Sequence, residues 1–278
     1  MTRAWTRTDT AGFLRVPTAD DDKYSRGVVA LRTGSAAYPG AAVLGVEAAW
    51  RAGAGYVRYL GGAADAVLAR RPETVAAQEL GRTRVGAWVI GSGTDAAQGG
   101  EHEEIELRRI LAGTDPVVVD AGALDLAQGA VAPLVLTPHA GELAALRARL
   151  GLEPRDSLAG DDRRVAEAEE TASALGAVVL SKGARTVVAA PDAESLIVGN
   201  GPAWLSTAGT GDVLAGILGA LIAANPERPL AHTAAAAAWL HGAAAARASG
   251  AQDGAIGHPI VAMDVAEALP ATIAELIA

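Results

Sequence analysis

Residues Ala208-Gly209-Thr210-Gly211-Asp212 stand directly before an uncharged apolar run that extends from Val213 to Ala224. This run is shorter than the ~18 residues that suggest a membrane span, so it predicts a buried helix. Glycines immediately before a helix expose backbone N–H groups at its positive end, and such a turn favours an anion such as a phosphoryl group. We therefore expect a buried helix that begins at an anion-binding turn.

The carboxylate of Asp212 has two interpretations at this position. It can act as the cap of the helix, in which case the glycines only make the turn. Alternatively, it can take a proton from a hydroxyl group that attacks a bound phosphoryl group, although it is badly placed to bind phosphate itself because like charges repel. The residues around Asp212 leave both interpretations open.

Outward from this stretch, short β-branched runs alternate with longer stretches rich in Ala, Leu, Glu and Arg. Such alternation is typical of parallel strands joined through helices, so we predict an α/β fold with a mostly parallel central sheet and helices on both faces. The expected strands are Val28–Arg32, Tyr56–Leu60, Ala87–Ile90, Val117–Asp120, Leu134–Thr137, Val178–Ser181, Thr186–Ala190 and Ser195–Val198.

The last two expected strands are close in sequence, with Pro191 and Asp192 between them, which predicts an antiparallel hairpin at a sheet edge. The stretch from Thr233 to Ala248 is nearly all Ala and predicts a helix that packs closely on a neighbour. No linker or internal repeat divides the chain. We therefore expect one domain over residues 1–278, with residues 1–22 as a flexible N-terminal segment.

Composition excludes several classes of function. The 278 residues include 23 Lys and Arg against 32 Asp and Glu, a net charge of −9, so no bulk positive field is available to hold a nucleic acid. The absence of Cys excludes disulfides, thiolate metal sites and thiol nucleophiles. With no signal peptide and no apolar run of membrane length, we expect a cytoplasmic protein without a membrane partner.

Three further turns follow expected strands and are candidates for ligand contact. Gly91-Ser92-Gly93-Thr94-Asp95-Ala96 follows the strand that ends at Ile90 and can touch a ligand through its backbone. His139 lies in Leu136-Thr137-Pro138-His139-Ala140-Gly141-Glu142, at the carboxyl end of a strand, where α/β proteins bind ligands. Residues 182–186 form a basic turn between two strands, which by itself is typical of a solvated loop.

Taken in order, these motifs resemble the ADP-dependent NAD(P)H-hydrate dehydratase family, which has a ribokinase-like fold. The resemblance covers most of the chain, from about Lys23 to Gly242. It rests on Gly34-Ser35, Tyr38-Pro39-Gly40-Ala41-Ala42, Arg51-Ala52-Gly53-Ala54-Gly55, Ile90-Gly91-Ser92-Gly93, Val119-Asp120-Ala121-Gly122-Ala123-Leu124, Leu136-Thr137-Pro138-His139-Ala140-Gly141-Glu142, Leu180-Ser181-Lys182-Gly183 and Gly209-Thr210-Gly211-Asp212.

The resemblance implies repair of hydrated NADH or NADPH, in which a nucleotide phosphorylates the ring hydroxyl and phosphate then leaves. It implies that Asp212 accepts the hydroxyl proton while the backbone N–H groups of Gly209, Thr210 and Gly211 stabilise the transferred phosphoryl group. By motif position, the substrate site consists of Ala41, Gly93, His139 and Asp212. The nucleotide site consists of Lys182, Gly183, Ala184, Arg185, Thr186 and Gly211.

The phosphoryl donor is expected to be ADP, with ATP as the other option, together with Mg2+, whose ligands the sequence does not specify. The family also suggests a homo-oligomer such as a tetramer. The chain has no room for the fused epimerase domain of some relatives, so a separate epimerase is the expected functional partner.

Two segments depart from the family pattern. The family commonly has His-Lys-Gly-x-Tyr-Gly before the first strand, where this chain has Asp22-Lys23-Tyr24-Ser25-Arg26-Gly27, and Asn200 is displaced relative to the Gly-Asn that precedes the anion loop.

Two other functions remain open. One is a small-molecule kinase of the same fold, of the hydroxyethylthiazole or hydroxymethylpyrimidine kinase type. The other is a non-catalytic adenine-nucleotide-binding module.

Overall fold

The computed structural model describes residues 2–94 and 100–278, and ten strands of this part form one sheet in the order β1-β10-β9-β8-β7-β6-β5-β2-β3-β4. β9 is antiparallel to β8 and to β10, and every other neighbouring pair is parallel. The strands are β1 Thr2–Ala4, β2 Val28–Arg32, β3 Tyr56–Tyr59, β4 Val75–Ala76, β5 Ala87–Ile90, β6 Val117–Val119, β7 Leu134–Leu136, β8 Val178–Ser181, β9 Thr186–Ala189 and β10 Ser195–Val198.

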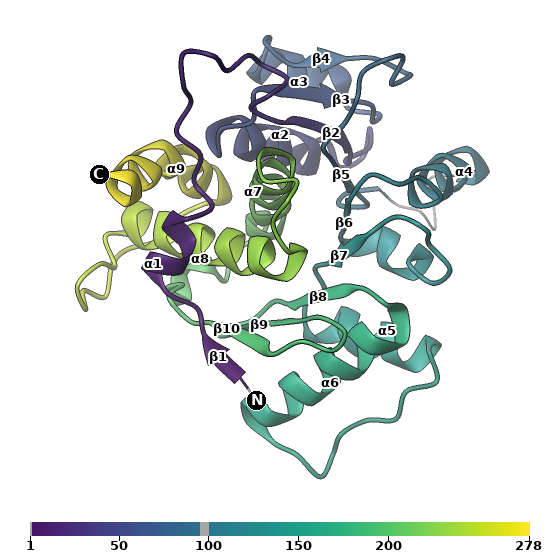
Figure 1. Cartoon of the computed structure of the whole chain (residues 1–278), viewed down its shortest axis with the longest axis vertical. Coiled ribbons are helices and arrows are strands. Elements are labelled where there is room, and N and C mark those ends of the chain that lie inside the picture. Colours follow the sequence, from purple (N-terminus) through teal and green to yellow (C-terminus); the bar gives the residue numbers. More distant parts are fainter. Residues whose placement is uncertain (1, 95–99) are drawn as a thin grey trace.

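Helices cover both faces of the sheet (Figure 1), so the predicted α/β fold class is confirmed. The side chains of successive strand residues point to opposite faces, as they do in β5. Val89 packs into the core formed with α2, α7, α8 and α9, whereas Trp88 packs into a core on the other face. The helices are α1 Arg7–Ala11, α2 Pro39–Arg51, α3 Ala64–Arg70, α4 Gly100–Leu111, α5 Ala140–Arg149, α6 Gly160–Leu175, α7 Thr210–Ala224, α8 Leu230–Ser249 and α9 Ala262–Ile277, with short 3-10 turns η1 Ala121–Leu126 and η2 Ala203–Leu205.

All eight strands predicted from the sequence are present, with ends that agree within one residue. β1 and β4 were not predicted, because three and two residues are too few to show a hydrophobic pattern. The predicted hairpin between β9 and β10 is antiparallel, as expected. Its predicted place at the sheet edge is wrong, because β1 pairs with β10 and forms the edge instead.

The helix predicted from the apolar run after Asp212 is α7, and the prediction that it is buried is confirmed. It packs against α2 at a very short distance between the two backbones. A Cβ atom built on Gly216 would lie 2.2 Å from the carbonyl oxygen of Gly45, so a side chain at this position would push the helices apart. This close contact fixes the start of α7 relative to α2.

The N-terminal segment contributes β1 and α1 to the fold, and its Trp5 and Phe13 side chains lie in the core with 6% exposure each. The Ala-rich stretch forms α8, whose residues 234–238 are buried within the chain against α7, α9 and the sheet. The organisation of residues 1–278 as one domain stays a prediction.

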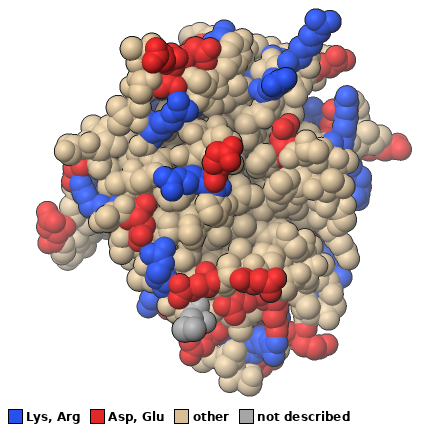
Figure 2. Space-filling view, in the orientation of Figure 1, with Lys and Arg blue, Asp and Glu red and all other residues tan. Residues whose placement is uncertain are grey.

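Surface charge is mixed on the face in Figure 2, where Lys and Arg side chains lie beside Asp and Glu side chains. Acidic side chains gather over its lower part, where Figure 1 shows α6 and the N-terminus. Among the described helices, none is long and apolar enough to cross a bilayer.

Candidate active site

Loops from four neighbouring parallel strands meet at the start of α7. The strands β5, β6, β7 and β8 are followed by Ser92, Asp120, His139 and Lys182, respectively. The carboxyl ends of parallel strands share one edge of the sheet, and open α/β sheets bind ligands there. The fold therefore brings together most of the residues that the sequence motifs predict.

The start of α7 has the geometry of an anion-binding turn. Gly209 lies at the N-cap with a φ of +86°, a conformation that favours glycine. The Thr210 hydroxyl donates to the carbonyls of Leu205 and Thr207 at 3.1 and 3.0 Å, which anchors the turn. The backbone N–H groups of the first helical turn have no partners within the helix and are available to an anion.

Asp212 lies in the first turn of α7, and its carboxylate is bound by another loop. Its Oδ1 accepts a hydrogen bond from the Ser92 hydroxyl, which belongs to the loop after β5. Burial raises the pKa of Asp212, and the charge of Asp120 raises it further, while Ser92 and Lys182 oppose the shift. A carboxylate with a raised pKa is a stronger proton acceptor, which suits general-base catalysis. The capping interpretation is disfavoured because the N-cap of α7 is Gly209 and no side-chain hydrogen bond caps this helix.

Lys182 brings a positive charge to the same place. Its Nζ lies 2.8 Å from Asp120 Oδ1 and 3.7 Å from Glu142 Oε2. Asp120 is only 3% exposed, and its Oδ1 also accepts from the Thr137 hydroxyl at 2.7 Å. A Cβ atom built on Gly211 would lie 3.5 Å from Nζ, so the amine stands directly beside the first turn of α7. Lysine is well suited to bind a phosphate at such a position.

Ala41 and Gly93 lie side by side, as a shared substrate site requires. A Cβ atom built on Gly93 would be 2.5 Å from the Cβ of Ala41. Gly93 follows Ser92, the partner of Asp212, so this part of the predicted substrate site adjoins the carboxylate. Asp95 and Ala96, the end of the predicted loop motif, lie outside the described residues.

His139 has a structural role in addition to the predicted contact with substrate. Its Nδ1 accepts from the backbone N–H groups of Gly141 and Glu142 at 3.1 and 3.2 Å, which caps α5. The side chain is 61% exposed, and Nε2 lies 3.5 Å from the Glu142 carboxylate. Through Glu142, the ring is linked to Lys182 and to the same edge of the sheet.

The basic turn between β8 and β9 is hydrogen-bonded to α6. Arg164 donates to the carbonyls of Ser181, Lys182 and Arg185. The Arg185 guanidinium pairs with Asp161 at 3.1 Å, so it is directed toward α6. The turn is therefore bound to α6 through its backbone carbonyls, while the Lys182 amine lies beside α7.

A cavity of about 500 Å³ lies between this basic turn, the start of α7 and α8. Its wall includes Lys182, Gly183, Ala184, Thr186 and Gly211, five of the six residues predicted to bind the nucleotide. It also includes Asn200 and His241, for which the sequence motifs predict no role. Asn200 stands where the sequence departs from the family pattern, and His241 is a buried residue of the Ala-rich helix α8.

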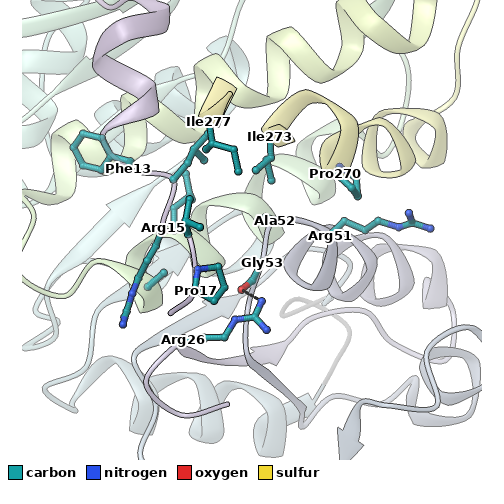
Figure 3. A pocket seen from close by; sticks show the side chains of 14 residues that line it. Phe13, Arg15, Pro17, Arg26, Arg51, Ala52, Gly53, Pro270, Ile273 and Ile277 are labelled. Atoms are coloured by element: carbon teal, nitrogen blue, oxygen red, sulfur yellow. Dashed lines mark hydrogen bonds between the residues drawn. The ribbon is translucent and has the colours of Figure 1, made fainter. Parts of the chain in front are cut away.

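A second hollow of about 260 Å³ lies at the other end of α7, where Leu221 and Ala224 form part of its wall (Figure 3). Twelve residues of helix separate Ala224 from Asp212, or about 18 Å at 1.5 Å per residue. Phe13, Pro270, Ile273 and Ile277 contribute apolar surface to this hollow, and Arg15, Arg26 and Arg51 contribute charge.

The donors available to a metal ion at the start of α7 are two carboxylates, Asp120 after β6 and Asp212 in the first turn of α7. In the described part of the chain, no group of three or more His, Asp or Glu side chains is arranged to hold a metal by itself. Asp120 and Asp212 are close enough for the charge of one to shift the pKa of the other. Such a pair fits Mg2+, which uses one or two carboxylates together with substrate phosphates and water.

The fold is that of the ribokinase-like class, since the chain superposes on a ribokinase-like superfamily protein of Enterococcus faecalis with a TM-score of 0.83 at 23% identity, covering 99% of this chain and 96% of that one. The family model for NAD(P)H-hydrate dehydratase matches residues 29–264, and the chain belongs to this family. It is 44% identical over 226 residues to the bifunctional NAD(P)H-hydrate repair enzyme Nnr of Mycobacterium tuberculosis, with 78% of this chain and 45% of that protein covered. The chain thus spans about half the length of that relative.

Shorter relatives and solved structures agree with this assignment. The ADP-dependent (S)-NAD(P)H-hydrate dehydratase of Neisseria meningitidis is 39% identical over 245 residues, which cover 81% of this chain and 78% of that protein. The ADP/ATP-dependent NAD(P)H-hydrate dehydratase of Bacillus subtilis, co-crystallised with ATP and Mg2+, superposes with a TM-score of 0.82 at 26% identity, covering 98% of each chain.

Proposed function

We propose that the chain catalyses the ADP-dependent dehydration of (S)-NAD(P)H hydrate to NAD(P)H. The observation that carries this proposal is the half-buried Asp212 carboxylate in the first turn of α7, with Lys182 next to the same turn. Family membership supports the substrate, and the name of the Neisseria relative supports ADP as the phosphoryl donor.

Asp212 is the proposed general base for phosphorylation of the ring hydroxyl. As the hydroxyl oxygen bonds to the terminal phosphorus of ADP, its proton moves to the Asp212 carboxylate and AMP is released. Burial makes this carboxylate more basic than an exposed one, and the Ser92 hydroxyl holds it in place. The ring phosphate then leaves with the electrons of the C–O bond, because phosphate is a far better leaving group than hydroxide. The neighbouring ring carbon loses a proton to solvent or to the departing phosphate, and the electrons of its C–H bond form the ring double bond of NAD(P)H.

The charge that develops on the transferred phosphoryl group is stabilised from two sides. Backbone N–H groups of Gly209, Thr210 and Gly211 are available at the start of α7, and the Lys182 amine adds a full positive charge. Asp120 holds this amine through an ion pair until a phosphate competes for it. Mg2+, bound by Asp120 and Asp212 together with nucleotide phosphates, would neutralise further phosphate charge.

The substrate is proposed to lie against Ala41 and Gly93, with its ring hydroxyl toward Asp212. The contact between Ala41 and Gly93 and the bond from Ser92 to Asp212 place these residues next to one another. His139 would line the substrate site on the side where β7 ends. Its Nδ1 is already used to cap α5, so contact with the substrate would come from Nε2 or from the ring face.

Three wider assignments belong to this proposal. A cytoplasmic location fits the absence of Cys. A homo-oligomer is proposed from the family. An epimerase activity is proposed as the functional partner, because several relatives are named bifunctional repair enzymes. Size-exclusion chromatography with light scattering would test the oligomer.

Purified protein incubated with hydrated NADH tests the activity directly. We expect the absorbance of reduced nicotinamide to return when ADP is supplied, with release of AMP and phosphate. The same assay with ATP in place of ADP determines the donor, and hydrated NADPH determines the substrate preference. No recovery with either donor would contradict the proposal.

The same assay separates the proposed activity from the two other functions. A small-molecule kinase of this fold would leave a stable phosphorylated product and no reduced nicotinamide. A nucleotide-binding module would bind ADP without consuming it, and substitution of Asp212 by Asn would change no measured property.

A further inference from the structure

A third hollow, of about 760 Å³, lies at the edge of the sheet opposite to the candidate active site. Its wall includes Val28, the first residue of β2, and Gly86, which precedes β5, whereas the active-site loops follow the last residues of these strands. The five residues of β2 separate the two regions by about 16 Å at 3.3 Å per residue. A ligand in this hollow would therefore be remote from Asp212.

Three arginines line this hollow, which we call the arginine hollow: Arg58 from β3, and Arg82 and Arg84 from the segment between β4 and β5. Arg58 is hydrogen-bonded to that same segment. Its Nη1 donates to the Thr83 hydroxyl at 2.8 Å, and its Nη2 donates to the Glu79 carbonyl at 3.1 Å. Both acceptors are uncharged, so these bonds position the guanidinium without neutralising it. The three arginines are therefore brought to one wall before any ligand binds.

The positive charge of the arginine hollow is not balanced by ion pairs within the described part of the chain. Of the 21 arginines in the sequence, fifteen pair with a described carboxylate, and three of the other six line this one hollow. This concentration occurs in a chain whose net charge is −9. Like charges in one hollow repel each other, and an anion bound between them relieves that repulsion.

The rest of the wall is rigid and partly apolar. A Cβ atom built on Gly27 would lie 2.7 Å from the carbonyl carbon of Ala223, and one built on Gly86 would lie 3.0 Å from the Ala223 Cα. This close packing fixes the strand starts against the end of α7. Tyr24 and Leu80 add apolar surface, so the hollow has room for an organic group beside an anion.

We propose that the arginine hollow binds a phosphoryl oxyanion, either inorganic phosphate or the phosphate group of a monoester. Guanidinium groups bind phosphate oxygens through paired N–H donors, which makes arginine the side chain best suited to this group. The apolar part of the wall gives the organic part of a monoester a surface to contact. This site is separate from the nucleotide site, and it does not depend on the proposed function.

Calorimetric titrations with inorganic phosphate and with ribose 5-phosphate, at constant ionic strength and without ADP or hydrate, test this site. We expect the wild type to bind phosphate, and the tighter of the two ligands identifies free phosphate or a monoester as the source. A protein with both Arg82→Gln and Arg84→Gln should bind the tighter ligand at least ~10-fold more weakly, because hydrogen bonds from charged donors are the stronger ones.

Two controls assign the binding to the arginine hollow. A protein with both Arg108→Gln and Arg109→Gln loses the same charge from exposed residues of α4 outside the hollow, and it should bind as the wild type does. Lys182→Met changes the anion-binding turn at α7 instead, and it should keep the binding that the Arg82 and Arg84 substitutions weaken. Circular dichroism checks the fold of each variant, and if the double variant does not fold, the single substitutions Arg82→Gln and Arg84→Gln decide the question.

The outcomes that overturn this inference differ from those that overturn the proposed function. Wild-type protein that binds neither ligand, or full binding by the folded Arg82 and Arg84 variant, would overturn it. Binding that is lost only in Lys182→Met would assign the phosphate to the turn at α7 and would also overturn it. None of these results changes the expected recovery of NADH, and failure of that recovery would leave this site in place.

Discussion

A cavity lies at each end of α7, but the polar groups around the two cavities differ in their interactions. At the N-terminal end, the Asp212 carboxylate is half-buried and the Lys182 amine stands beside the first turn of the helix. At the C-terminal end, the arginines are engaged by the protein. Arg26 donates to the Gly53 carbonyl at 3.2 Å (Figure 3), and Arg51 donates to Glu47 at 2.8 Å.

The charged groups at the two ends therefore differ in their surroundings, and only the N-terminal end adds the unpaired backbone N–H groups of a helix start. The arginines at the C-terminal hollow already have hydrogen-bond partners within the protein, so their role in stabilising the fold is enough to account for them. A cavity alone is therefore a weaker sign of function than the charged groups and helix N-terminus that stand at its wall.

The largest effect is expected from Asp212→Asn at the N-terminal end. This change removes the proton acceptor but keeps the shape of the side chain, so turnover should fall by at least ~10²-fold, the lower range for loss of general-base catalysis. ADP binding should persist. Steady-state rates of NADH recovery and calorimetry with ADP measure the two properties.

The control for this variant is Asp192→Asn, in the turn between β9 and β10, where φ is +55° and Asn is well tolerated. Its turnover should match that of the wild type. Near-normal turnover of Asp212→Asn would return this residue to a structural role.

The buried His241 predicts a loss of stability in acid. In the folded protein its pKa is about 4, against 6.5 when exposed, so between these values the unfolded chain binds a proton that the folded chain does not. The free energy of unfolding should therefore fall as the pH drops from about 6.5 to about 4, by about 3 kcal/mol from this group. Urea unfolding of the wild type and of His241→Phe at several pH values measures the difference. If the free energy of unfolding falls with decreasing pH equally in the two proteins, His241 does not titrate in this way.

Lys182→Met should weaken ADP binding by about 10-fold to 100-fold, because hydrogen bonds to charged groups contribute about 1.5–3 kcal/mol. The chain has only one other lysine, Lys23, which lies over the rings of Tyr24 and Tyr56. Lys23→Met is therefore the matched control and should bind ADP as the wild type does. Equal affinity of Lys182→Met and the wild type would remove the amine from the nucleotide site.

The smallest effect is expected at the C-terminal end of α7. Arg26→Ala removes one hydrogen bond to a backbone carbonyl on the surface, so the free energy of unfolding should change by no more than about 1 kcal/mol. The rate of NADH recovery and the affinity for ADP should stay unchanged. A large loss of either would show that the hollow in Figure 3 takes part in function.

The sequence predicted the central strands and α7 well because their residues form continuous apolar runs, which a parallel sheet and a buried helix require. It could not predict β1, whose three residues are a strand only because β10 lies beside them. The edge position of the β9–β10 hairpin was wrong for the same reason. Pairing with a distant segment leaves no local pattern in so short a stretch.

The same distinction holds at the site. Asp212 and Lys182 could be recognised from the sequence because each stands beside glycines in a motif. The roles of Ser92 and Asp120 depend on partners 120 and 62 residues away in the chain, so nothing near them in sequence indicates those contacts. Residue 241 is one of two histidines in an otherwise Ala-rich helix, and that contrast is the signal that could have found it.

The structure of the chain in complex with ADP tests the central assignment most directly. We expect the terminal phosphoryl group over residues 209–211, beside the Lys182 amine and facing the Asp212 carboxylate, with the base between α8 and the basic turn. A nucleotide bound instead in the hollow at the far end of α7, or an Asp212 carboxylate directed away from the phosphoryl group, would contradict the account.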